Sequence, residues 1–305
     1  MNGTPRRAYA LRGVLPLLYQ GGRTVKLVED RRPTLASWPK RIYQWSELPQ
    51  LFRPALEEWR GEGLPPGNVT YIPQVRQGVG EEEHAVSWWR GQVLLQTLWR
   101  GGVTRLLIPQ GAAAIRYEVQ LLKCTLTIYL KNGDQASFSY NKVKEDQLRP
   151  VLSLLLGRPS GLAFPTEHPE PERLGWLLEE SYGMYHTALL CYRLGERLED
   201  CLYLRGKTGG LLWLIQRTPD PEYFLGVMNR GLAAISHDSY STCVLYAPWE
   251  SMDGAELVPE RRGYSLQVQA AGGKMTIPVQ GGQIEKVRNF LDHLSRENDQ
   301  ISQFH

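Results

Sequence analysis

The sequence contains little cysteine, and none of it is spaced as a redox or zinc pair. The four cysteines are Cys124, Cys191, Cys201 and Cys243. They form no CxxC pair, and a chain of 305 residues does not depend on a disulfide framework to fold. We therefore expect reduced thiols that are partly buried as small apolar groups.

The sequence also lacks a segment that is apolar enough to cross a membrane or to direct secretion. The longest apolar runs, at 151–156 and 211–215, fall far below the roughly 20 residues of a membrane helix. Near the N-terminus, Arg12 interrupts the one stretch that is similar to the apolar part of a signal peptide. These absences predict a cytoplasmic protein without a targeting segment.

The common motifs of catalysis and metal binding are missing as well. There is no GxSxG motif, and the six histidines show neither HExxH nor zinc-finger spacing. Gly206-Lys207-Thr208 is similar to the end of a phosphate-binding loop, but Cys201 stands where that loop requires its first glycine. We therefore predict no catalytic residue, no metal ligand and no cofactor, and we expect that the protein is not an enzyme.

Apolar and aromatic residues are present in the amounts of an ordinary globular protein. Hydrophobic residues make up 42% of the chain and charged residues 22%, which is unlike a disordered sequence. Nine Trp, fifteen Tyr and six Phe can fill two modest cores without disulfides or metal. The length itself suggests about two domains.

Positive charge is concentrated at the N-terminus. Residues 1–42 carry nine basic and two acidic side chains, a local charge of +7, which leaves −4 for the rest because the total is +3. Such an arm can bind phosphates of nucleic acid or lipid, or an acidic patch of a partner, or it can pack on its own domain. The candidate binding residues in the arm are Arg6, Arg7, Arg12, Arg23, Lys26, Arg31 and Arg32.

Two stretches of the chain share the same order of features, as in an internal repeat. Gly133 and Gly273, which occupy matching positions, are 140 residues apart. Each copy is predicted to form antiparallel strands followed by one helix, at 145–156 and at 283–294. The apolar residues of both helices recur every three or four positions, so each helix has one face that needs a sheet to cover.

Short turns predict hairpins in both copies. Asn132-Gly133 can supply the positive φ angles of a tight turn, and residues 271–273 can do the same in the second copy. Further hairpins at 93–108 and 224–235 extend the two copies towards the N-terminus.

A helical pattern precedes the strands of each copy, at 51–59 and at 172–198. Gly175 and Gly183 weaken the second helix, so we expect it to break. The segment between the copies is rich in Pro and Gly and is predicted to be a linker. The chain is thus divided into a basic N-terminal arm (1–42), a first module with its helical lead-in (43–157), the linker (158–171), a second module with its lead-in (172–296) and a polar tail (297–305).

Together these features resemble bacterial pleckstrin-homology-like domains. The likeness rests on a strand that ends at Pro109 or Pro248, a following strand around Glu118 or Glu256, a hairpin across Asn132-Gly133 or Gly272-Gly273, and one amphipathic C-terminal helix. It covers roughly residues 90–157 and 222–295.

The resemblance implies an α+β fold of two tandem pleckstrin-homology-like modules. Each module is expected to be a bent antiparallel sheet with a C-terminal capping helix, and the helical lead-in segments lie outside the minimal domain. We expect each module to bury its own faces in a separate core. The resemblance also implies interaction with proteins or membrane surfaces rather than catalysis.

Two tryptophan–arginine neighbours offer further candidates for binding. Arg90 follows Trp89, and Arg100 follows Trp99, a combination that is also used in nucleic-acid stacking. We take Arg90, Trp99 and Arg100 as candidate binding residues; the alternative is that the aromatics pack in a sheet with a cation at its edge. Because the chain outside 1–42 is slightly acidic, the pattern argues against a nucleic-acid partner.

The sequence therefore predicts a non-catalytic interaction or scaffolding protein that binds a protein partner or an anionic membrane surface. One alternative is an enzyme whose site is assembled at the interface of the two modules, which requires a deep pocket with convergent polar groups there. A second alternative is nucleic-acid binding through the basic N-terminal arm.

Overall fold

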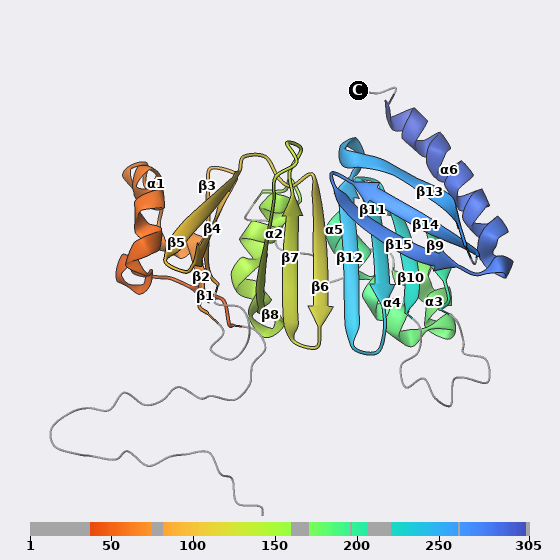
Figure 1. Ribbon diagram of the computed structural model, residues 1–305, viewed down its shortest axis with the longest axis horizontal. Helices are drawn as coiled ribbons and strands as arrows, with labels where there is room; N and C mark the ends of the chain where they lie inside the picture. Colours follow the sequence, from red (N-terminus) through yellow and green to blue (C-terminus); the bar gives the residue numbers. More distant parts are fainter. Residues whose placement is uncertain are drawn as a thin grey trace, which may run out of the picture. The chain divides into compact units, whose positions relative to one another are not determined.

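The computed structural model describes residues 37–74, 82–159, 171–195, 197–206, 221–261 and 263–302 (Figure 1). Most of the basic arm and most of the predicted linker lie outside these residues. The described part consists of several short helices, one long C-terminal helix and three open antiparallel sheets, and none of these sheets closes into a barrel. The α+β class is thereby confirmed.

The first sheet has the order β1-β2-β3-β4-β5, and all its neighbouring strands are antiparallel. These strands are β1 (Lys40–Arg41), β2 (Val69–Ile72), β3 (Glu83–Trp89), β4 (Gln92–Trp99) and β5 (Gly102–Ile108). On β4, Val93 and Leu95 pack on one side and Leu94 on the other, as the period of a strand requires. Both faces of this sheet are therefore covered.

Short helices between β1 and β2 cover one face of the first sheet. They are η1 (Trp45–Glu47), η2 (Gln50–Leu56), α1 (Glu57–Gly61) and η3 (Pro66–Asn68). Phe52 and Leu56 are fully buried there against Val69 and Leu94. Pro54 lies inside η2, and the α-helix begins only at Glu57, which agrees with the missing N–H of proline.

A seven-stranded sheet joins the two predicted modules. Its order is β8 (Gln135–Asn141), β7 (Lys123–Tyr129), β6 (Ala114–Gln120), β12 (Ser241–Pro248), β11 (Gly231–His237), β10 (Glu222–Met228) and β9 (Leu198–Leu204). Strand β6 of the first module pairs with β12 of the second, from Ile115↔Tyr246 to Gln120↔Ser241. We call this β6–β12 pairing the seam.

The third sheet and the last helix pack on one face of the seven-stranded sheet, over the strands of the second module. The sheet has the order β13 (Met252–Glu260), β14 (Gly263–Ala270) and β15 (Gly273–Val279), preceded by η7 (Trp249–Ser251) and followed by η8 (Gly281–Gln283) and α6 (Ile284–Ser302). Leu266, Ile277 and Phe290 form one cluster with Leu225 and Leu232 of the seven-stranded sheet. Among the described residues, no helix has the length and apolar character needed to cross a bilayer.

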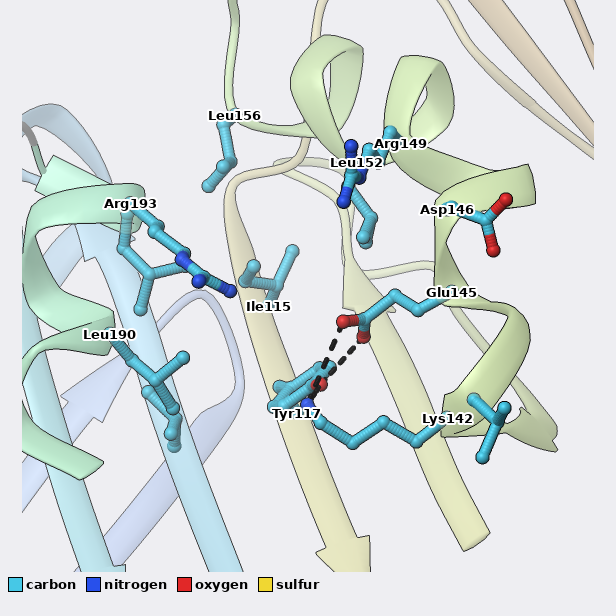
Figure 2. A pocket seen from close by; sticks show the side chains of 13 residues that line it. Ile115, Tyr117, Lys142, Glu145, Asp146, Arg149, Leu152, Leu156, Leu190 and Arg193 are labelled. Carbon is cyan, nitrogen blue, oxygen red and sulfur yellow. Dashed lines mark hydrogen bonds and ion pairs between the residues drawn. The ribbon is translucent and has the colours of Figure 1, made fainter. Parts of the chain in front are cut away.

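The opposite face of the seven-stranded sheet carries the remaining helices. These are η4 (Lys142–Leu148) with α2 (Arg149–Leu155), and η5 (Pro171–Leu174), α3 (Gly175–Glu180), α4 (Tyr182–Ala188) and α5 (Leu190–Gly195). The second helical lead-in is broken, with an extended residue at Ser181 rather than at either glycine. Among the described residues, no helix covers the strip of sheet over the seam, between α2 and α5. Figure 2 shows side chains that line this strip.

Hairpins form at the predicted turns, but the positive φ expected of Asn132 is wrong, because only Gly133 has a positive φ in that turn. Gly133 has a φ of +87° between β7 and β8, and Ala271 and Gly272 have φ values of +47° and +85° between β14 and β15. The hairpins predicted at 93–108 and 224–235 are β4–β5 and β10–β11. Local residue types were sufficient for these turns because glycine adopts positive φ without a steric penalty.

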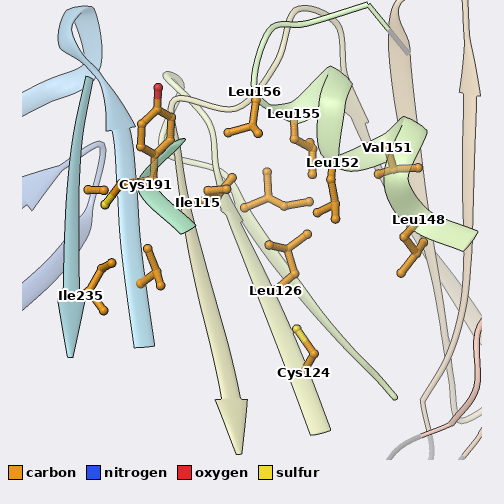
Figure 3. Close-up of a cluster of buried hydrophobic side chains, with 14 of the residues drawn as sticks. Ile115, Cys124, Leu126, Leu148, Val151, Leu152, Leu155, Leu156, Cys191 and Ile235 are labelled. Carbon is orange, nitrogen blue, oxygen red and sulfur yellow. The ribbon is translucent and has the colours of Figure 1, made fainter. Parts of the chain in front are cut away.

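The expectation of a separate core for each module is wrong. One hydrophobic cluster contains Leu126 and Leu148 of the first module together with Cys191 and Ile235 of the second (Figure 3). The cause is the seam, because a sheet that continues through both modules presents one continuous apolar face to the helices.

One buried histidine in the first sheet makes stability depend on pH. His84 is 4% exposed, and its Nδ1 lies 3.0 Å from Thr97 Oγ1. Burial lowers the pKa of His84 from 6.5 to about 4. Glu82 Oε2 is 3.7 Å from the imidazole Nε2, but this carboxylate is half exposed, so solvent screens its attraction.

We expect the free energy of unfolding to fall as the pH is lowered from about 6.5 towards 4, because the unfolded chain binds a proton that folded His84 rejects. Between pH 7 and pH 5 the contribution of this group is about 2 kcal/mol. Urea unfolding of His84→Gln should show a flatter dependence on pH, whereas the exposed His186→Gln should keep the wild-type slope. Equal slopes for all three proteins would contradict the assignment.

Candidate binding groove over the seam

The uncovered strip of the seven-stranded sheet is the floor of a groove. Its facing residues are the cross-strand pairs Ile115↔Tyr246, Tyr117↔Val244 and Val119↔Thr242. All of them except Tyr246 line two adjoining cavities of about 250 and 270 Å³. The two cavities share Lys142, Leu190 and Arg193 and thus form one continuous space, which we call the seam groove.

Two helical walls border the seam groove. One is η4–α2, with Lys142, Glu145, Arg149, Leu152 and Leu156; the other is α4–α5, with His186, Thr187, Leu190, Arg193 and Leu194. The first wall starts where Asn141 Oδ1 accepts a hydrogen bond of 3.0 Å from the N–H of Val143. Five of its lining residues recur every three or four positions, and Val143 and Asp146 beside them line the same cavity.

A buried arginine ties the walls together at one end. Arg158, just after α2, donates to the carbonyl oxygens of Arg193 and Leu194 on α5, at 2.8 and 2.7 Å. Arg158 is only 8% exposed. A guanidinium group bound to the last carbonyls of a helix is favoured by the helix dipole. The groove is therefore closed by this bridge near Leu156 and Leu194.

Two further arginines face the groove and form no ion pair with another described residue. Arg149 and Arg193 are exposed, and in the part of the chain that the structure describes neither guanidinium group forms a salt bridge. They come from opposite walls, and both side chains are directed into the space between the walls (Figure 2). The carboxylate of Asp146 lies beside Arg149 on the same wall. Apolar side chains lie beside them, at Ile115 and Val244 of the floor and at Leu152 of the first wall.

A polar network fills the side of the groove at η4. Tyr117 and Tyr140 both donate to Glu145 Oε1, at 2.6 and 2.9 Å. Lys142 Nζ contacts Tyr117 Oη and lies 3.6 Å from Glu145 Oε2. Burial, together with nearby Cys124 and Glu145, raises the pKa of Tyr117 and of Tyr140 well above the ordinary tyrosine value. Both phenols therefore stay protonated and donate hydrogen bonds at neutral pH.

This chemistry suits binding better than nucleophilic catalysis. The Cys124 thiol lies behind the network, and burial raises its pKa to about 12. A thiol and two phenols that hold their protons supply neither a nucleophile nor a base at pH 7. Among the described residues, no group of three His, Cys, Asp or Glu side chains is placed to hold a metal ion. The paired guanidinium groups instead fit carboxylates or phosphates.

The candidate residues from the first module's sheet do not form one site. Arg90 lies in the β3–β4 turn and pairs with Glu62 at 3.1 Å, whereas Trp99 and Arg100 lie at the opposite end of β4. Arg100 stacks on Trp99 at 5.1 Å, and Trp99 is 39% exposed. The candidates in the arm, Arg6, Arg7, Arg12, Arg23, Lys26, Arg31 and Arg32, lie outside the described residues.

Sequence reasoning missed the residues of the seam groove. Ile115, Tyr117 and Val119 alternate along β6 with Arg116 and Glu118, which is a visible strand signal. Nothing local showed that β12 would lie beside them. Arg149 and Arg193 occupy the polar sides of two predicted helices, where an arginine normally faces solvent.

Comparisons with known proteins do not assign this chain to a family. No protein-family model matches the sequence, and a search of curated proteins finds no significant match. The geometry of the seam groove is therefore the basis for a functional proposal.

Proposed function

We propose that the protein is a non-catalytic, cytoplasmic interaction protein whose seam groove holds an acidic, partly apolar segment of a protein partner. The observation that supports this most is the pair Arg149 and Arg193, which face each other over an apolar floor without salt bridges to other described residues. A guanidinium group binds a carboxylate through two parallel hydrogen bonds, and the apolar floor removes side chains of the segment from water.

The shape of the site favours a protein segment over an anionic membrane. The apolar residues lie at the bottom of a groove with a helical wall on each side, and Arg158 bridges the walls at one end. A flat bilayer surface does not reach such a floor, whereas an extended strand or a helix does.

The alternative of an enzyme between the two modules applies to the same place. The groove has polar groups that converge, as that alternative requires. We nevertheless favour binding, because the tyrosines and the thiol in the network hold their protons at neutral pH.

We further propose that the chain is a tandem of two pleckstrin-homology-like modules that share the seven-stranded sheet. The support is the order of elements. In the first module, the strands β2 to β5 are followed by the strands β6 to β8 and then by α2. In the second module, the strands β9 to β12 are followed in the same way by β13 to β15 and then by α6. In this proposal the last three strands of the first module extend the first four strands of the second.

The proposed function is tested by selecting binders from a phage-displayed library of random 16-residue peptides on the full chain. We expect the recovered peptides to be enriched in Asp and Glu and to contain Leu, Ile or Phe. As synthetic peptides in fluorescence anisotropy, they should bind Arg149→Gln/Arg193→Gln at least about tenfold more weakly than wild type.

Arg105→Gln is the matched control, because Arg105 is an exposed arginine of β5 outside the groove; it should bind the peptides like wild type. Recovery of no peptide, or peptides that bind the double variant equally well, would overturn the proposal. The same would follow if wild type bound vesicles of phosphatidylcholine and phosphatidylserine through Arg149 and Arg193 but bound no peptide.

A further inference from the structure

The turn between β6 and β7 is made by residues that do not suit it. Leu121 has a φ of +54°, a conformation in which a side chain with a Cβ is strained. Arg90, Arg100 and Ala271 are the other non-glycine residues with positive φ in the described chain, and each is followed by a glycine that shares the turn. Leu121 is followed by Leu122. An asparagine or glycine at position 121 would form the same turn with less strain.

The same turn exposes a cluster of large apolar side chains. The exposed fractions are 63% for Leu121, 58% for Leu122, 58% for Val143 and 61% for Tyr240. The backbone holds these residues together, since the N–H of Leu121 donates to Tyr240 O at 3.1 Å and the N–H of Lys142 donates to Leu122 O at 2.9 Å. We call these four residues the tip cluster. Local strain combined with exposed apolar surface is typical of a contact site.

The tip cluster lies at the open end of the seam groove. Val119 and Thr242 line the groove, and each is two residues from a member of the cluster. Lys142 lines the groove and adjoins Val143. The other end is bridged by Arg158. From Ile115 on β6 to Leu121 in the turn that follows it, the six residue steps correspond to about 20 Å, which an extended segment of about six residues spans.

We propose that the tip cluster is the second half of the partner site and binds the apolar end of the same segment. This inference rests on the proposed function, and it gives the direction in which the ligand lies in the groove. The acidic residues of the ligand lie between Arg149 and Arg193, and its apolar end leaves the groove over Leu121, Leu122 and Tyr240. In this proposal the strained turn presents the Leu121 side chain to the partner.

The test measures stability and binding on the same variant. Leu121→Asn should raise the melting temperature of the full chain by about 2 °C, because strain is relieved. It should also weaken binding of the synthetic peptides recovered from the library at least about fivefold, because apolar contact is lost. Ala271→Asn is the matched control: it places asparagine at another residue with positive φ, on the β14–β15 turn, and should leave peptide binding unchanged.

The possible results separate this inference from the proposed function. If Arg149→Gln/Arg193→Gln loses the peptides and Leu121→Asn keeps wild-type affinity, the function stands and the inference is wrong. A lower melting temperature for Leu121→Asn would refute the argument from strain. If Leu121→Asn abolishes binding to phosphatidylcholine–phosphatidylserine vesicles while peptide binding is unchanged, the tip contacts a membrane and the inference also falls.

Discussion

Gly231→Ala should destabilise the protein by about 3 kcal/mol or more, the largest loss that we expect from adding a single methyl group. Gly231 is the first residue of β11 and pairs with Pro248 of β12. A Cβ atom at this position would lie 2.1 Å from Ala247 O and 2.8 Å from Pro248 Cα. Both contacts are with backbone, so no side chain can move aside and the two strands must separate.

Thermal and urea unfolding of the purified chain measure this effect. Gly282→Ala is the matched control, because a Cβ at Gly282 would meet no heavy atom within 4 Å. Its effect should stay below about 1 kcal/mol in either direction. Equal stability of Gly231→Ala and Gly282→Ala would show that β11 and β12 are not as close at this point as described.

Glu145→Ala should cost about 2–4 kcal/mol of stability, because it removes the acceptor shared by two tyrosines. Tyr140 is fully buried, so its hydroxyl group cannot turn to water when Glu145 is absent. Tyr117 Oη would lose its hydrogen bond of 2.6 Å to Glu145 Oε1. The ion pair between Glu145 and Lys142 contributes little to the free energy of unfolding, since the lysine side chain is 36% exposed.

Two comparisons define the result for Glu145. Glu145→Gln keeps one acceptor oxygen and should lose less than half as much stability as Glu145→Ala. Glu256→Ala removes an exposed glutamate of β13 and should change stability by less than about 0.5 kcal/mol. If Glu145→Ala unfolds at the same urea concentration as Glu256→Ala, the network does not hold η4 against the sheet.

The parts of the fold that could be predicted depend on residues close together in sequence. Gly133 and Gly272 have the positive φ expected at their turns, because glycine adopts it without a steric penalty, whereas Asn132 does not have the positive φ expected of it. The helix expected at 145–156 is present as η4 and α2, although its first half has 3₁₀ geometry with a non-helical residue at Lys144.

The seam could not be predicted from local patterns. Val119 and Thr242 face each other across β6 and β12 but are 123 residues apart in the chain. Alternation of apolar and polar residues shows that a strand has a buried face, but it does not identify the neighbouring strand. Because the groove exists only where β6 meets β12, the sequence did not show that its lining residues belong to one site. The sequence pattern indicated Trp99 and Arg100 as binding residues instead.

The bridge that Arg158 makes between α2 and α5 has a consequence for the kinetics of recognition. The two walls are held apart at a fixed spacing before any ligand arrives, and the floor between them is a hydrogen-bonded ladder of six residue pairs. A receptor that is already ordered loses little conformational entropy when it is occupied. Association is then limited mainly by how fast the incoming chain itself becomes ordered, so stiffening that chain, and not this protein, is the effective way to speed the formation of the complex.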